Sequence, residues 1–259
     1  MAFRARLGGE RAYMYFADVH CHILYGVDDG AKSREQMFRM ADMAYGAGTR
    51  FLCATPHFNP EIFRHHPHRE ERVFGELKAY CEERYPDLRL ILGSEIMVYG
   101  DIREALLKGE LRCLGSSNNV LVEFLPREEL SIIRLALMRI RNSGLKPVLA
   151  HVERYAALRS PVIIEELKDA GITITANASS VEGKNGWGAK RFVYQLLRHG
   201  LVDIIASDGH NDKNHPPRLD CCADVISKRF YGEYAEQLTY LNALSLFDIQ
   251  TESGDESGN

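Results

Sequence analysis

Short apolar segments alternate with longer amphipathic segments along almost the whole chain. The short ones are rich in Val, Ile, Leu and aromatic residues, and several are almost continuously apolar, as strands buried on both faces tend to be. They predict seven strands, over residues 14–19, 51–54, 88–92, 120–124, 147–150, 172–176 and 202–206. The intervening segments carry apolar residues at helical spacing. They predict a helix between Ser33 and Gly46 and further helices over residues 69–84, 128–142, 161–170, 188–199 and 219–230.

The first helix has a defined start in the sequence. Ser33 stands at the position of an N-cap, and Gln36 follows three residues later, which is the spacing of a capping box. Gly46 and Gly48 end the amphipathic pattern. At the start of another predicted helix, Trp187 follows Gly186, and we expect its indole to pack between helix and barrel.

Repeated strand–helix alternation predicts an α/β fold of parallel strands joined by right-handed crossovers. Either a closed barrel or an open doubly wound sheet fits this order, and a barrel usually needs about 250 residues. With 259 residues and no internal repeat or linker, we expect one domain over residues 14–250. Residues 1–13 are expected to form an N-terminal extension. Residues 251–259, which are Gly, Ser and acidic, are expected to form a disordered tail.

Composition and charge argue against some classes of protein. The chain is 45% hydrophobic and 26% charged, and 32 Lys and Arg against 36 Asp and Glu give a net charge of −4, which offers no case for a general nucleic-acid binder. No apolar run reaches the roughly 20 residues of a membrane helix, so no membrane insertion is expected. Six cysteines without a C-x-x-C pair indicate a cytoplasmic protein with reduced thiols.

Metal-binding side chains gather where the predicted strands end. His20 and His22 lie two residues apart at the end of the first strand, on the face that they share with Asp18. Later strand ends carry further imidazoles and carboxylates, namely His57, Glu95, Glu123, His151, Asp208 and His210. The sixth strand ends in Asn177, followed by Ser179 and Ser180, and these residues point less clearly to metal binding.

Taken singly, these residues have ordinary structural explanations. A His-x-His pair can be two half-buried strand histidines, and a lone Glu at a strand end is usually solvated. In a parallel barrel, however, all strand carboxyl ends open on one face, where active sites are built. Five histidines and several carboxylates on that face predict a centre for more than one divalent cation. Such cations lower the pKa of bound water and clamp phosphoryl oxygens.

Two common phosphate chemistries do not fit the sequence. A cysteine-dependent phosphatase uses Cys-x5-Arg, and none of the six cysteines has Arg six residues later. A Walker phosphate loop is also absent. The segment Arg64-His65-His66-Pro67-His68 is expected to be a solvated loop. Its alternative role is to border the bound substrate at the mouth of the barrel.

Several motifs of the chain belong together. They are Asp18–His22, Asp28-Asp29-Gly30, Ala54-Thr55-Pro56-His57, Glu95, Glu123, His151-Val152-Glu153-Arg154-Tyr155 and Ser207-Asp208-Gly209-His210-Asn211. Together they resemble the PHP (polymerase and histidinol phosphatase) superfamily. More closely, the chain is similar to the manganese-dependent protein-tyrosine phosphatases of bacterial capsule and exopolysaccharide synthesis. The resemblance implies a distorted (β/α)7 barrel with its metal site at the carboxyl ends of the strands.

The resemblance implies three metal ions. Their ligands would be His20, His22, Glu95 and Asp208 for the first; Glu95, Glu123 and His151 for the second; and Asp29, His57 and His210 for the third. Asp28 is the alternative to Asp29. Nitrogen and oxygen ligands without thiolate suit Mn, Fe or Zn, and the resemblance favours Mn.

The resemblance also implies how a substrate would be held. Arg154, Asp208 and His210 would be catalytic, and Arg154 would bind phosphate. A second phosphate-binding arginine is expected just before a Pro-Pro pair, where this chain has His215 and, beyond the prolines, Arg218. The implied substrate is phosphotyrosine on a protein, with a bacterial tyrosine autokinase as the partner. The alternatives are a small phosphomonoester such as histidinol phosphate, and a non-enzymatic barrel that binds a kinase.

Overall fold

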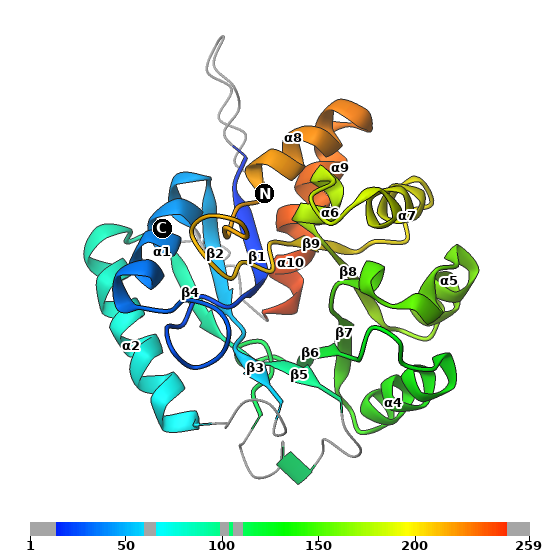
Figure 1. Ribbon diagram of the computed structural model, residues 1–259, viewed down its shortest axis with the longest axis horizontal. Helices are drawn as coiled ribbons and strands as arrows, with labels where there is room; N and C mark the ends of the chain where they lie inside the picture. Colours follow the sequence, from blue (N-terminus) through cyan, green and yellow to red (C-terminus); the bar gives the residue numbers. More distant parts are fainter. Residues whose placement is uncertain (1–13, 60–65, 99–103, 106–110, 248–259) are drawn as a thin grey trace, which may run out of the picture.

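Parallel strands form a ring at the centre of the molecule, and helices cover its outside (Figure 1). The structure is a computed structural model, and it describes residues 14–59, 66–98, 104–105 and 111–247. Its strands are β1 (Phe16–Cys21), β2 (Thr49–Ala54), β3 (His57–Phe58), β4 (Arg89–Leu92), β5 (Glu95–Met97), β6 (Asn119–Glu123), β7 (Lys146–Leu149), β8 (Thr173–Asn177) and β9 (Ile204–Ala206).

Helices follow most of the strands, as the amphipathic segments predict. They are α1 (Arg34–Gly46), α2 (Pro67–Arg84), α4 (Leu130–Asn142), α5 (Pro161–Asp169), α6 (Ala178–Glu182), α7 (Trp187–Arg198), α8 (Asp220–Arg229), α9 (Gly232–Glu236) and α10 (Asn242–Leu246). Three short turns complete them, η1 (Val152–Arg154), η2 (Ala156–Leu158) and the π-helical η3 (Gln237–Leu241). The predicted cap of α1 is confirmed, because the Ser33 side chain accepts a hydrogen bond from the Gln36 amide.

The labelled strands occupy seven positions in the ring. β2 and β3 follow one another in one position of the ring, and β4 and β5 follow one another in the next, because β2 pairs with β4 and β3 pairs with β5. Each of these two positions is therefore filled by a broken strand. The first break falls at Pro56, which has no N–H for a sheet hydrogen bond. The pairing order is β1-β2-β4 and β3-β5-β6-β7-β8-β9, and every pair is parallel.

Backbone contacts between the first and last positions close the ring. The His22 amide donates to the Gly209 carbonyl at 2.8 Å, and the Asp208 amide donates to the His20 carbonyl at 3.0 Å. The segment after β9 therefore lies beside the end of β1, and Figure 1 shows the two loops that follow these strands side by side. The predicted distorted (β/α)7 barrel is confirmed.

The C-terminal helices lie at the amino ends of the strands. Asn119, the first residue of β6, donates to the Leu246 carbonyl, and Asn242 donates to the Asp203 carbonyl just before β9. Apolar side chains of α10 join strand residues such as Leu121 and Val148 in one core cluster. Because these helices cover the amino ends of the strands, polar residues can gather at the carboxyl ends. Sequence patterning did not predict the helices beyond residue 230.

Some expectations are corrected or lie outside the described residues. Trp187 does not pack between helix and barrel, because its side chain is 74% exposed at the start of α7. His66 and His68 are exposed, as expected of a solvated segment, but Pro67 and His68 form the start of helix α2 and are not part of a loop. Arg64 and His65 lie outside the described residues. The proposed extension over 1–13 and tail over 251–259 also lie outside them. In the described part of the chain, no helix combines the length and apolarity that crossing a bilayer requires.

Two neighbouring isoleucines of α4 test the packing of the helical layer. Ile133 is fully buried in the largest core cluster, whereas Ile132 is 48% exposed. We expect Ile133→Ala to lower the free energy of unfolding by about 2–5 kcal/mol, because it removes apolar contacts and leaves a cavity. Ile132→Ala should change it by only about 0.5 kcal/mol. Denaturant unfolding of both variants measures the difference, and equal losses would contradict this packing of α4.

Candidate metal centre

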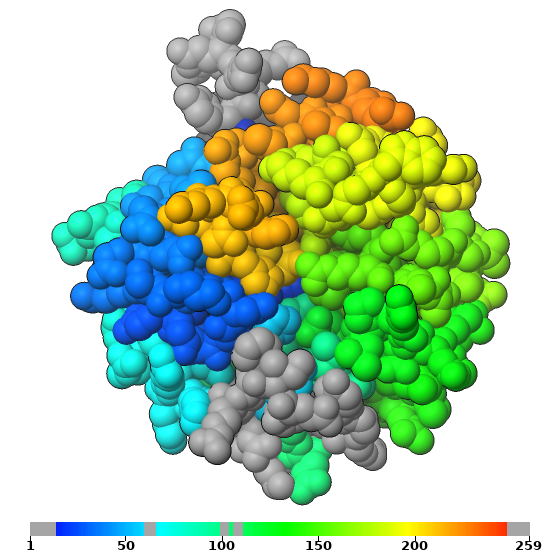
Figure 2. All heavy atoms as spheres, in the orientation of Figure 1, coloured from blue at the N-terminus to red at the C-terminus, as the bar shows by residue number. Residues whose placement is uncertain are grey.

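Nine predicted ligands come together at the carboxyl end of the barrel. They arrive from six positions of the ring and from the loop after β1, and ion-pair contacts join them into one continuous network. The nine residues are His20, His22, Asp29, His57, Glu95, Glu123, His151, Asp208 and His210. Figure 2 shows this side of the molecule, with the segment between β9 and α8 in gold against the blue N-terminal elements. Asp212 in that segment binds Gln36 and Arg39 of α1.

The first group lies around the end of β1. The Nε2 atoms of His20 and His22 are 3.0 Å apart, and each lies 3.1 Å from Glu95 Oε2. Asp208 Oδ1 is 3.4 Å from the His20 nitrogen and 3.6 Å from that of His22. These are the four residues that the resemblance groups around the first ion.

The second group surrounds the two glutamates. His57 Nδ1 lies 3.1 Å from both Glu95 Oε2 and Glu123 Oε1. His151 Nε2 lies 2.8 Å from Glu95 Oε1 and 3.6 Å from Glu123 Oε2. Glu95 thus uses both oxygens and stands between the first two groups, as the resemblance implies. The proximity of His57 to this group was not expected.

The third group includes the aspartate of the loop after β1. Asp29 Oδ1 is 3.5 Å from Nε2 of both His57 and His210. The ring of His22 stacks on that of His210 with centroids 4.0 Å apart, and His22 also has a nitrogen close enough to serve this group. The third group therefore shares His22 with the first and His57 with the second.

The donor geometry fits divalent cations. Ligand bonds of about 2.0–2.2 Å at octahedral or tetrahedral angles put neighbouring donor atoms about 3.0–3.5 Å apart. The separations in all three groups are close to this. Among the described residues, the buried atoms Glu95 Oε2 and Asp208 Oδ1 accept no hydrogen bond, although buried carboxylate oxygens normally do. A cation is the partner that would satisfy them.

The two aspartates of the loop after β1 have different positions. Asp28 Oδ2 accepts hydrogen bonds from His22 Nδ1 at 2.8 Å and from the His57 amide at 3.0 Å, and Oδ1 accepts from the Gly30 amide. This fixes the His22 ring with Nε2 toward the cluster. Asp29 instead joins the third group directly. The geometry favours Asp29 over Asp28 as the ligand candidate, with Asp28 orienting an imidazole.

Two further side chains orient cluster residues, and sequence analysis gave neither a role. The Tyr155 hydroxyl lies 3.3 Å from His151 Nδ1, which leaves Nε2 free to face Glu95. Asn177 Nδ2 donates to Asp208 Oδ2 at 2.7 Å, so Oδ1 of that carboxylate faces His20. The position of Asn177 at the end of a predicted strand was the available signal.

Buried Glu153 supports this arrangement from behind. One oxygen of its carboxylate accepts hydrogen bonds from the Asn177 amide at 3.0 Å and from the Ser180 hydroxyl at 2.6 Å. These contacts fix the end of β8, and with it the side chain that holds Asp208. The glutamate between His151 and Arg154 therefore belongs to the support of the site.

Two cluster residues have an unusual backbone. His151 and Asp208 have φ angles of 32° and 53°, and among the described residues they are the non-glycine residues with positive φ. Such conformations cost about 1–3 kcal/mol and concentrate at functional sites. In both cases the chain leaves a strand and turns at the residue that points into the cluster.

The electrostatics keep the carboxylates charged. Burial alone would raise the pKa of Glu95, but the neighbouring His20 and His57 hold it well below its usual range. Burial likewise opposes ionisation of Asp208, and the charges of His20 and Arg154 overcome it and lower the pKa. Burial lowers the pKa of His151, whereas its contacts with Glu123 and Glu95 raise it to about 9. Cation binding would displace protons from such imidazoles.

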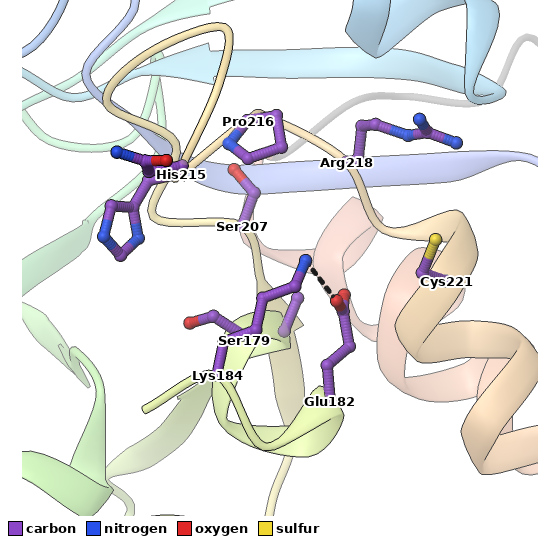
Figure 3. A pocket seen from close by; sticks show the side chains of 10 residues that line it. Ser179, Glu182, Lys184, Ser207, His215, Pro216, Arg218 and Cys221 are labelled. Atoms are coloured by element: carbon purple, nitrogen blue, oxygen red, sulfur yellow. Dashed lines mark ion pairs between the residues drawn. The ribbon is translucent and has the colours of Figure 1, made fainter. Parts of the chain in front are cut away.

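The predicted substrate-binding residues are placed differently from one another. Arg154 lies at the rim of the cluster, with its guanidinium on Asp208 Oδ2 and its side chain 42% exposed. His215 accepts backbone hydrogen bonds from His210 and Asn211 through its carbonyl, so it stays beside the cluster. Arg218 forms a two-point ion pair with Asp220 and points away from His215 (Figure 3). Both line a pocket with Lys184 and Ser207.

This fold and site define a class of protein, the (β/α)7 barrels with a candidate multi-cation centre at the carboxyl ends of the strands. Within that class, the chain belongs to the CpsB/CapC family of capsular polysaccharide synthesis, whose model matches residues 16–248.

Named relatives agree with this assignment. The chain is 32% identical over 227 residues to the tyrosine-protein phosphatase CpsB of Streptococcus pneumoniae, which covers 85% of this chain and 93% of the relative. It is 31% identical over 236 residues to the tyrosine-protein phosphatase YwqE of Bacillus subtilis strain 168, covering 90% and 92%. A putative tyrosine-protein phosphatase, CapC of Staphylococcus aureus, is 28% identical over 222 residues, covering 85% and 86%.

Solved structures support the same fold. A structure from the crystallographic work on YwqE and CpsB, described as unique metal-dependent tyrosine phosphatases, superposes with a TM-score of 0.82 at 30% identity and covers 91% of this chain and 95% of its own. The lactonase Lmo2620 of Listeria monocytogenes has a TM-score of 0.59 at 9% identity, covering 92% and 96%. At that identity the likeness extends to the fold alone.

A glycine holds the Asp28–Asp29 loop against β1. A Cβ atom on Gly30 would lie 1.9 Å from the His22 carbonyl oxygen. We expect Gly30→Ala to lower the free energy of unfolding by about 1–3 kcal/mol, because backbone must move to make room. In the matched control, Gly75→Ala, a Cβ meets nothing within 4 Å on helix α2, and the change should stabilise by about 0.5–1 kcal/mol. Denaturant unfolding compares them, and a neutral Gly30→Ala would show that the loop does not lie this close.

Proposed function

We propose that this protein is a metal-dependent protein-tyrosine phosphatase, a phosphoric monoester hydrolase whose domain spans residues 14–250. The observation that carries the proposal is the set of nine imidazole and carboxylate side chains in mutual contact at the carboxyl end of the barrel, with Arg154 at its edge. Membership of a family with named tyrosine phosphatases supports it.

The three groups of donors suit three divalent ions. We assign His20, His22, Glu95 and Asp208 to the first, Glu95, Glu123 and His151 to the second, and Asp29, His57 and His210 to the third. Nitrogen and oxygen donors are compatible with Mn, Fe and Zn, and we propose Mn. Bound ions of this kind supply an activated water and neutralise charge on phosphoryl oxygens.

Arg154 is the residue that we assign to the phosphate. One nitrogen of its guanidinium holds Asp208, and the partly exposed remainder of the planar group can form paired hydrogen bonds with phosphate oxygens. His215, which lies beside His210, is the second contact that the geometry favours. Arg218 would first have to leave Asp220. Asp208 and His210 act with Arg154 as the catalytic set.

The substrate that we propose is phosphotyrosine on a bacterial tyrosine kinase that controls capsule or exopolysaccharide synthesis, and the compartment is the cytoplasm. The names of the relatives support the residue class of the substrate. The six free cysteines are compatible with a reducing compartment. The same site could also accept a small phosphomonoester, so histidinol phosphate is the comparison substrate.

Metal removal tests the proposal. We expect a chelator to abolish hydrolysis of a phosphotyrosine peptide, Mn to restore it best, and the peptide to be preferred to histidinol phosphate.

Substitution of a single donor gives a second test. His20→Ala should lower turnover at least about 100-fold, because it removes a nitrogen donor of the first group. Metal content by mass spectrometry and circular dichroism accompany the assay. Full turnover in protein verified to be metal-free, or in folded His20→Ala, would refute the proposal.

A lysine variant tests the role of Arg154. If its guanidinium forms paired contacts with phosphate, Arg154→Lys should lose about tenfold or more in kcat/KM and in vanadate affinity, although it keeps the positive charge. Metal content should stay at the wild-type level. If Arg154 only braces Asp208, the variant will instead lose metal while metal-saturated protein keeps its vanadate affinity.

A further inference from the structure

The outer face of α7 carries a basic and aromatic groove that the candidate metal centre does not use. Six residues of α7 and α8 line it, namely Trp187, Lys190, Arg191, Tyr194, Arg198 and Arg229. Trp187 is 74% exposed, which is unusual for an indole without a binding partner. The sequence pattern indicated a helix here, and the structure shows that its first residue projects into solvent.

The charge of the groove is of one sign. Four of its six lining residues are cationic and none is acidic, in a chain whose net charge is −4. Among the described residues, none of the four forms an ion pair with a carboxylate. Three of the four cations lie over rings instead: Arg191 is 5.3 Å from the Trp187 centroid, and Arg229 and Lys190 are 4.4 and 5.7 Å from that of Tyr194. An acidic ligand could therefore bind without first breaking a salt bridge.

The groove begins beside the segment that carries Arg154. η1 packs against α7, and Arg159 connects the two by donating to the carbonyls of Glu153 and Gly188. Trp187 and Gly188 form the start of α7, so this end of the groove lies next to the rim of the cluster. The twelve residues of α7 extend about 18 Å, which an extended peptide of about five residues would match.

We propose that this groove binds an acidic segment of the phosphoprotein substrate, flanking the phosphotyrosine that enters the metal centre. Trp, Tyr and Arg are the residue types that dominate binding energy in protein interfaces, and here they surround one concave surface. A membrane surface is the less suitable anionic partner, because it requires a broad exposed apolar face, whereas one aromatic side chain of the groove is exposed. The link to phosphotyrosine rests on the function proposed above.

The tryptophan gives a readout that is independent of catalysis. Trp187 is the one tryptophan of the chain, so intrinsic tryptophan fluorescence reports on the groove directly. The probe is a tryptophan-free acidic peptide with a central tyrosine, used with and without phosphate. We expect a saturable fluorescence change for both forms that weakens as salt is added.

Charge reversal at the far end of the groove tests the contact without touching Trp187 or Arg191. We expect Arg198→Glu with Arg229→Glu to weaken peptide binding at least about tenfold and to raise KM for the phosphopeptide in parallel. Turnover of p-nitrophenyl phosphate should stay the same, because this substrate has no flanking segment. Arg89→Glu with Arg139→Glu is the matched control: it makes the same change in net charge at exposed residues of β4 and α4 and should behave as wild type.

The outcomes separate this proposal from the proposed function. The proposal that the groove binds an acidic segment is wrong if the groove variant and the control variant bind the peptide equally well. It is also wrong if the fluorescence of the wild type does not change. A response to vesicles of phosphatidylglycerol but not to the peptide also overturns it, in favour of a membrane surface. Peptide binding that depends on Arg198 and Arg229 supports the groove even if no phosphate is hydrolysed, and in that case only the proposed function fails.

Discussion

The buried carboxylate of Glu95 is the group around which the carboxyl end of the barrel is arranged. Its two oxygens lie within 3.1 Å of nitrogens of His20, His22, His57 and His151. A buried carboxylate without partners of this kind would cost several kcal/mol. The imidazoles come from or directly follow β1, β3 and β7, whereas Glu95 starts β5, so the contacts form only when the ring is assembled. Folding and assembly of the candidate metal centre are therefore one event.

Around this carboxylate, the backbone is held in conformations that would be unfavourable elsewhere. His151 and Asp208 have positive φ angles, and Gly30 approaches the His22 carbonyl more closely than a side chain would allow. Surrounding contacts from Tyr155 and Asn177 fix the side chains that these backbone turns present. The site thus has two layers, donors that face one another and hydrogen-bonding groups behind them that set their direction.

Much of the site could be predicted because of one property of parallel sheets. Residues at the carboxyl ends of parallel strands meet at one end of a barrel whatever the details of the loops, so His20, Glu95, His151 and Asp208 could be brought together before any contact was known. The different roles of the two aspartates after β1 were harder to predict from the sequence. Asp28 and Asp29 are adjacent and chemically identical, and the direction of each side chain depends on how the loop crosses β1.

The sequence by itself determined the order of the seven strand positions and of most helices up to residue 230, and it supplied candidate donors at the strand ends, since hydrophobic periodicity and residue chemistry are local properties that survive any packing detail. The closed barrel and the assignment of Asp29 came from the family resemblance, because the strand–helix order also fits an open sheet. Tertiary structure decided which donors are shared, as with His57 between two groups, and that Arg218 pairs with Asp220. It also decided that Trp187 faces solvent among cations of α7 and α8. These features depend on contacts between residues far apart in the chain, and no local pattern records the direction in which a side chain leaves its element.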